Sequence, residues 1–139
     1  MKITRRESLM LGLGAAVAAM VPTGVFAASF DEAVAAFTGG ASASEGGVVL
    51  TAPEIAENGN TVPIEVNAPG AVAIAVFAEK NPSPEVASFK FGPLSGSQRA
   101  AIRMRLAGTQ KIVVVAQMAD GSFVSTSQEV KVTIGGCGG

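Results

Sequence analysis

A single cysteine in a glycine-rich segment is the residue of this chain with the most distinctive chemistry. Cys137 is the one cysteine among 139 residues, and it stands in the run Gly135-Gly136-Cys137-Gly138-Gly139. Glycine has no Cβ and adopts backbone conformations closed to other residues, so four glycines predict a narrow segment with little conformational preference. At about 3.3–3.6 Å per extended residue, the sulfur can move on the order of 10 Å from Ile134. The pattern predicts a thiol that reaches into a pocket of another protein.

The competing interpretation is an incidental cysteine near a frayed chain end, because termini are commonly poorly ordered. The compartment weakens that interpretation. An unpaired thiol in an oxidising compartment invites intermolecular pairing or reaction, so its retention there indicates a use. The first residues of the chain indicate such a compartment.

The N-terminus has the pattern of an export signal. Arg5 and Arg6 precede a weakly apolar stretch from Leu9 to Val21. The following Val25-Phe26-Ala27 fits a signal-peptide cleavage site with a small last residue, so cleavage is expected after Ala27. Paired arginines are typical of the twin-arginine route. The apolar stretch of about 13 residues is shorter than the roughly 20 that span a bilayer. We therefore predict a signal peptide over residues 1–27, a periplasmic mature protein and no membrane attachment after cleavage.

Composition excludes several classes of function. Residues 1–27 hold three of the ten basic and one of the eleven acidic residues, so the remainder has seven against ten and a net charge near −3. A mildly acidic domain without a basic run has nothing to hold a nucleic-acid backbone. The chain has no histidine, which excludes histidine-based triads and histidine metal sites. We expect no metal and no resident cofactor.

Hydrophobic periodicity predicts a short helix followed by strands. Ser29 and Glu32 form a capping-box pattern, apolar residues then recur at helical spacing, and Thr38-Gly39-Gly40 ends the helix. The small and polar residues 41–47 are typical of a flexible connection. A helix of about ten residues is marginal alone, so it must pack on the chain's own sheet or on a partner.

From Gly47 onward, apolar residues alternate with polar ones and turn residues separate the segments. Strands are expected near 48–51, 61–67, 71–78, 86–91, 99–106, 110–118 and 122–134, with a hairpin at Asp120-Gly121. Six phenylalanines supply the aromatic core, and Met104 and Met118 occupy core positions. About seven short strands predict an all-β, immunoglobulin-like antiparallel sandwich. The chain thus divides into a signal peptide (1–27), a helix and linker (28–46), a sandwich (47–134) and a cysteine-bearing tail (135–139).

Several motifs together resemble the SoxY family, the sulfur-carrier subunit of bacterial thiosulfate oxidation. Besides the leader and the Gly-Gly-Cys-Gly-Gly run, they are Ala36-Phe37-Thr38-Gly39-Gly40, Pro53-Glu54-Ile55-Ala56-Glu57-Asn58-Gly59, Val62-Pro63-Ile64, Phe77-Ala78-Glu79-Lys80-Asn81-Pro82 and Ala119-Asp120-Gly121-Ser122-Phe123. The resemblance extends over essentially the whole chain, and the glycine-flanked cysteine is its most specific part.

The resemblance implies a carrier without an active site of its own. SoxY-like proteins form an immunoglobulin-like sandwich that pairs with a second small sandwich, SoxZ, and their cysteine carries inorganic sulfur as an S-thiosulfonate or persulfide. A haem enzyme, SoxAX, would join thiosulfate to Cys137, SoxB would remove the terminal sulfone as sulfate, and SoxCD, where present, would oxidise the remaining sulfane sulfur. The absence of a histidine partner agrees with this division, because a thiolate must then be generated in the pocket of the enzyme.

Three other functions compete with the carrier. A glycine-terminated thiocarboxylate carrier needs cytoplasmic adenylation, which the leader contradicts, and prenylation needs a cysteine fourth from the end with aliphatic neighbours. A periplasmic binding or adhesion sandwich whose cysteine crosslinks two copies remains open. The charged residues Glu54, Glu57, Glu79 and Lys80 lie in or near loops, where they suit either a contact with a partner or, as charged residues more often do, a solvated surface. Arg103 and Arg105 suit either the steering of an anion or the protection of an edge strand.

Overall fold

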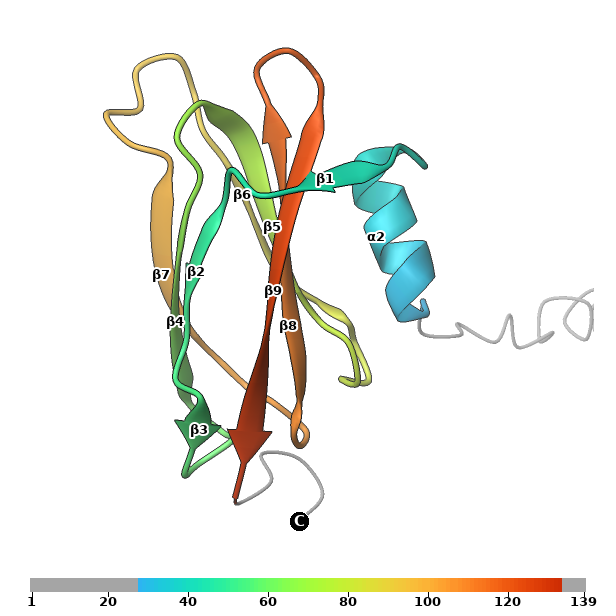
Figure 1. The fold of residues 1–139 in the computed structure, drawn as a ribbon, viewed down its shortest axis with the longest axis vertical. Coiled ribbons are helices and arrows are strands. Elements are labelled where there is room, and N and C mark those ends of the chain that lie inside the picture. The colour runs from blue at the N-terminus through green and yellow to red at the C-terminus, as the bar shows by residue number, and fades with distance from the viewer. Residues whose placement is uncertain (1–27, 134–139) are drawn as a thin grey trace, which may run out of the picture.

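Alternating apolar and polar residues build two β-sheets that pack face to face in the computed structural model, which describes residues 28–133 (Figure 1). The larger sheet has the order β1 (Ala43–Glu45), β9 (Phe123–Val132), β8 (Gln110–Met118), β5 (Ala71–Ala78) and β6 (Glu85–Lys90), and β3 (Ile55–Ala56) also pairs with β9. The smaller sheet has the order β2 (Val49–Thr51), β4 (Val62–Asn67) and β7 (Arg99–Met104). The predicted immunoglobulin-like sandwich is confirmed.

The core lies between the two sheets and is filled by aliphatic side chains. Its most buried members include Val62, Ile64, Val66, Ile74, Val76, Met104, Leu106, Ile112, Val114 and Val130. Most of them recur every two residues along their strands, and Leu106 lies two residues beyond the end of β7. Met104 is buried and Met118 packs against the core, as the sequence predicts.

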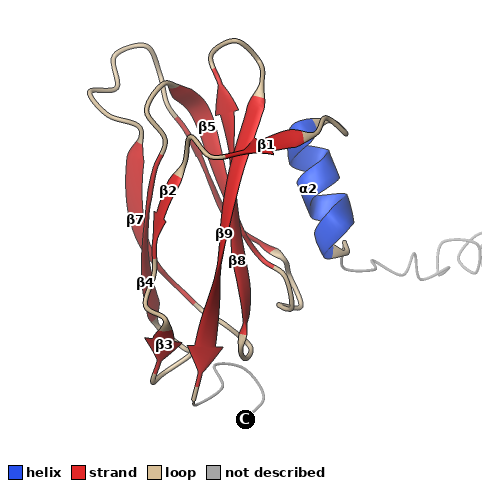
Figure 2. Cartoon of the chain, in the orientation of Figure 1, coloured by secondary structure: helices blue, strands red, loops and turns tan. Residues whose placement is uncertain are grey.

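Helix α2 (Phe30–Thr38) covers part of the outer face of the larger sheet (Figure 2). The predicted capping box is confirmed, because the Glu32 N–H donates to Ser29 Oγ and the Ser29 N–H donates to Glu32 Oε2. Gly39 ends the helix with φ 65°, a left-handed conformation that favours glycine. An edge-to-face contact joins Phe37 to Phe77 at a ring-centroid distance of 6.3 Å. The helix therefore packs on its own sheet.

All seven predicted strands are present, and the structure adds two short ones. The prediction of a flexible connection over 41–47 is wrong in its middle, where β1 pairs in parallel with the first residues of β9. Strand β3 pairs in parallel with the last residues of β9. Both additions depart from a purely antiparallel sandwich. Pairing through the backbone requires no apolar pattern in the short strand, so the sequence carries no signal for either.

The hairpin at Asp120-Gly121 joins β8 to β9 as predicted, with Gly121 at φ 85°. Val72 is 39% exposed at the start of β5, where the register against β8 shifts between Ala71 and Ala73. Within residues 28–133 the structure contains no helix with the length and apolarity that crossing a membrane requires.

Candidate functional site

The predicted site residues fall outside the part of the chain that the structure describes. These residues are Cys137 with Gly135, Gly136, Gly138 and Gly139, and the export residues Arg5 and Arg6. The structure does describe where the cysteine-bearing segment leaves the sandwich. Strand β9 ends at Val132, and Thr133 is the last described residue, four positions before Cys137.

Hydrogen bonds from two sides hold the end of β9. The Val132 N–H donates to Thr109 Oγ1 at 2.9 Å, which ties the strand to the loop before β8. On the other side the Thr133 N–H donates to Ala56 O at 3.1 Å, and Thr133 Oγ1 donates to Glu57 O at 3.2 Å. We call Val132 and Thr133 the root. Because its backbone is hydrogen-bonded on both sides, the root gives the following residues a fixed starting point.

The segment that carries β3 changes sheets just before it reaches the root. Strand β2 pairs with β4 in the smaller sheet, whereas β3 pairs with β9 in the larger one. Pro53 lies between the two strands, and a proline has no N–H to leave without a partner at such a crossing. The Gln128 side chain secures the crossing by donating from Nε2 to Ala52 O at 2.9 Å.

A hydrogen-bonded pair of side-chain amides, Gln110 and Asn81, orders the two loops beside the root. Gln110 is 2% exposed, and its Oε1 accepts a hydrogen bond from the Lys80 N–H at 2.8 Å. Its Nε2 donates to Asn81 Oδ1 at 2.9 Å and to Gly108 O at 3.2 Å. Asn81 in turn donates to Arg105 O at 2.8 Å. The loop that contains Thr109 is thereby fixed to the turn between β5 and β6.

A hollow of about 430 Å³ lies beside the root on the outer side of β3 and β9. It is lined by Glu54, Ile55, Gln128, Glu129 and Lys131. Ile55 is 58% exposed there, although Ala56 beside it is buried. The hollow therefore combines one exposed aliphatic side chain with a charged and polar border.

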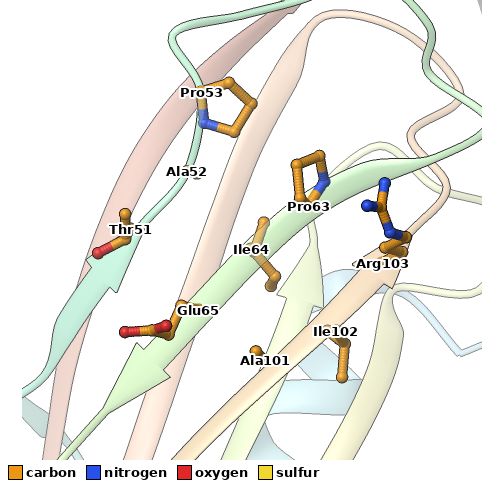
Figure 3. Close-up of a pocket in the computed structure, with 9 residues that line it drawn as sticks. All are labelled: Thr51, Ala52, Pro53, Pro63, Ile64, Glu65, Ala101, Ile102 and Arg103. Carbon is orange, nitrogen blue, oxygen red and sulfur yellow. The ribbon is translucent and has the colours of Figure 1, made fainter.

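A second and larger groove, of about 660 Å³, opens on the smaller sheet and is drawn in Figure 3. Strand β2 stops opposite Glu65, so Pro63 lies beyond its paired region and Pro53 and Pro63 stand on the two sides of the groove. Neither proline has an N–H with which to extend a strand ladder. Arg103 lies at the border of the groove, on the edge strand β7.

The charged side chains near this groove are exposed or partly exposed to solvent. Glu65 pairs with Arg99 across β4 and β7, and this hydrogen bond raises the pKa of Arg99. Arg103 lies on the edge strand β7 and is exposed. Arg105 is also exposed and follows Met104, the last residue of β7. Over residues 28–133 no three side chains of histidine, cysteine, aspartate or glutamate gather in a way that could hold a metal ion.

Sequence reasoning missed the residues that hold the root. Thr109 and Thr133 are exposed threonines near strand ends, and nothing in their spacing distinguishes them from solvated positions. Ile55 belongs to a motif that marks the family resemblance, yet its place beside the root is visible only through the pairing of β3 with β9. The Asn81–Gln110 pair joins residues 29 positions apart and has no local signature.

Comparisons with known proteins identify the family. The family model of the sulfur oxidation protein SoxY matches residues 34–137. The structure of the sulfur carrier protein SoxY from Chlorobium limicola f thiosulfatophilum matches with 42% sequence identity and a TM-score of 0.67, over 76% of this chain and 97% of that chain.

More distant structures share the fold alone. A superoxide reductase (neelaredoxin) from Ignicoccus hospitalis matches with 14% identity and a TM-score of 0.55, over 63% of this chain and 80% of its own. A putative superoxide reductase from Thermotoga maritima matches with 18% identity and a TM-score of 0.52, over 69% of this chain and 89% of its own. No curated protein matches. The family match and the 42% identity together establish that this chain belongs to the SoxY family of sulfur carriers in sulfur oxidation.

Proposed function

We propose that the chain carries thiosulfate-derived sulfur covalently on Cys137 and presents it to other enzymes of sulfur oxidation. The observation that carries the proposal is that the SoxY match extends to residue 137, which is the single thiol of the chain. The hydrogen-bonded root supports it as well. A carrier needs a fixed body and a narrow segment that enters a partner, and the last strand of the sandwich ends at Val132, five residues before the cysteine.

The chemistry assigns the bond changes to partners. Joining thiosulfate to the cysteine forms a sulfur–sulfur bond, releases the thiol proton and passes two electrons to a haem enzyme of the SoxAX type. Hydrolysis by a SoxB-type enzyme then breaks the bond to the sulfone with one water, which releases sulfate and leaves a persulfide. A SoxCD-type enzyme would oxidise that sulfane sulfur. The thiol reacts as a thiolate, and the chain has no histidine to generate one.

Two further parts of the proposal rest on the sequence and the family. The paired Arg5-Arg6 and the small residues that end at Ala27 support export to the periplasm by the twin-arginine route. Membership of the SoxY family supports a stable complex with a small β protein of the SoxZ type. The cargo on Cys137 is then an inorganic sulfur group, and the protein needs no resident cofactor.

The test is the replacement Cys137→Ser in the reconstituted thiosulfate-oxidising system. Thiosulfate-dependent electron release should stop while thermal unfolding stays unchanged, because the replacement changes one side-chain atom and none of the core residues. Intact mass should show sulfur adducts on the wild-type chain after thiosulfate treatment and none on the serine variant.

A matched pair of variants separates the carrier from the crosslinking alternative. Replacing Gly136 and Gly138 by valine stiffens and widens the segment that must enter a pocket, so electron release should slow without a change in folded fraction. Disulfide crosslinking of two copies has no such requirement. Full activity of the serine variant, or a loss in the valine variants only in proportion to lost folded protein, would contradict the carrier.

A further inference from the structure

Ile55 has an exposed aliphatic side chain at a position where the fold itself does not require an apolar residue. In the two-residue strand β3, Ala56 turns inward and is 6% exposed, whereas Ile55 turns outward and is 58% exposed. Ile55 lies opposite Lys131, two residues before Thr133 on the neighbouring strand. An aliphatic side chain in that place contributes little to the core of the chain itself.

Its surroundings resemble the centre of a protein–protein contact. Glu54, Gln128, Glu129 and Lys131 surround Ile55 and together with it line the 430 Å³ hollow. Interface hot spots combine an apolar centre that becomes fully buried with a polar border that excludes water. We call these five residues the root patch.

The root patch is held rigid before any partner binds. The Lys131 N–H donates to Glu54 O at 2.9 Å, and the Thr133 N–H donates to Ala56 O at 3.1 Å. Gln128 is fixed by its bond to Ala52 O. A surface already ordered in its binding conformation loses little conformational entropy on association.

The length of chain between the root and the thiol determines what covers this patch. Cys137 follows Thr133 by four residues, so its Cα lies within about 14 Å of the Thr133 Cα. With two residues along a strand and one step between strands, Ile55 lies about 8 Å from Thr133. A protein that encloses Cys137 in a channel must therefore approach the end of the sandwich that carries the root patch.

We propose that the root patch is the docking contact for the enzymes that accept Cys137, and that their channel mouths present an apolar pocket for Ile55. This inference rests on the proposed carrier function. The border has mixed charges, with Glu54 and Glu129 balanced by Lys131 and by Lys111, which lies opposite Glu129. Apolar burial therefore carries recognition, and the docking depends only weakly on salt.

The test compares Ile55→Arg with the matched control Val49→Arg in the full chain together with any subunit that copurifies. Val49 is also β-branched and 60% exposed. It lies six residues before Ile55 in β2, which pairs with β4 in the smaller sheet, whereas Ile55 pairs with β9 in the larger one. Val49 does not line the 430 Å³ hollow. The measurement is turnover by the thiosulfate-loading haem enzyme and by the sulfate-releasing hydrolase, with the carrier as the varied substrate.

For Ile55→Arg we expect KM to rise about tenfold or more with both enzymes and kcat to change less than twofold, since docking and not chemistry is altered. Val49→Arg should leave both constants unchanged. The rate at which a small alkylating reagent modifies Cys137 should be the same in all three proteins. Wild-type KM should change less than threefold between low and physiological salt.

Equal KM values for the two arginine variants would overturn the inference. A change of assembly state on sedimentation of Ile55→Arg would also overturn it, because the patch would then be an interface between stable subunits. If the proposed carrier function itself is wrong, the result is different: turnover then survives Cys137→Ser.

Discussion

The buried amide of Gln110 is expected to stabilise the loops beside the root, and Gln110→Met tests this. Methionine has a similar size and fills irregular spaces well, so the change removes hydrogen bonds with little loss of packing. The Lys80 N–H loses its acceptor, and Gly108 O loses one donor. Asn81 Oδ1 keeps the hydrogen bond that the Ala107 N–H donates at 3.0 Å.

The magnitude follows from the groups left without partners. One partly buried N–H that loses its acceptor costs about 1–3 kcal/mol. The Gly108 carbonyl adds little, because a carbonyl oxygen has a second lone pair. We expect the free energy of unfolding to fall by about 2 kcal/mol, which lowers Tm by about 8–16 °C for a domain of roughly 100 residues.

Urea denaturation and thermal unfolding measure the effect, and Gln98→Met is the control. The side chain of Gln98 accepts one exposed hydrogen bond, from the Gly70 N–H at 3.2 Å, so its replacement should change stability by less than about 0.5 kcal/mol. A double-mutant cycle with Asn81→Ala should give a coupling of about 0.5 kcal/mol or more, because the two amides are in direct contact. Equal losses for Gln110→Met and Gln98→Met would refute the reasoning.

Two further predictions concern the export signal and the N-terminal cap of helix α2. Replacing Arg5 and Arg6 together by lysine should leave uncleaved precursor in the cytoplasm, detected by fractionation and mass; unchanged export would exclude the twin-arginine route. A hydrogen bond from the Ser29 N–H lowers the pKa of Glu32, so the stability that this carboxylate contributes is present above its ordinary pKa and is lost as pH falls through the lowered one. Glu32→Gln should therefore lose less stability than wild type between pH 7 and pH 3, and parallel losses would show that the cap does not titrate as described.

Local residue types determined much of this protein. The capping pattern of Ser29 and Glu32 is satisfied within one turn of helix α2, and Asp120-Gly121 closes a hairpin between neighbouring strands. The seven main strands follow from alternation along the chain, because a half-buried strand repeats its apolar side chains every two residues. The sequence also indicates the expected roles of Cys137 and of the paired arginines, because each role depends on the residues adjacent in the chain.

The tertiary structure alone decided how the cysteine-bearing segment is anchored. The hydrogen bond from the Val132 N–H to Thr109 spans 23 positions, and that from Thr133 to Glu57 spans 76. Strand β3 is two residues long and has no period to detect, yet its pairing with β9 places Ile55 beside the root. Each of these contacts joins polar groups of distant segments through one or two hydrogen bonds, so neither composition nor periodicity predicts it. The contacts exist only once both sheets have formed.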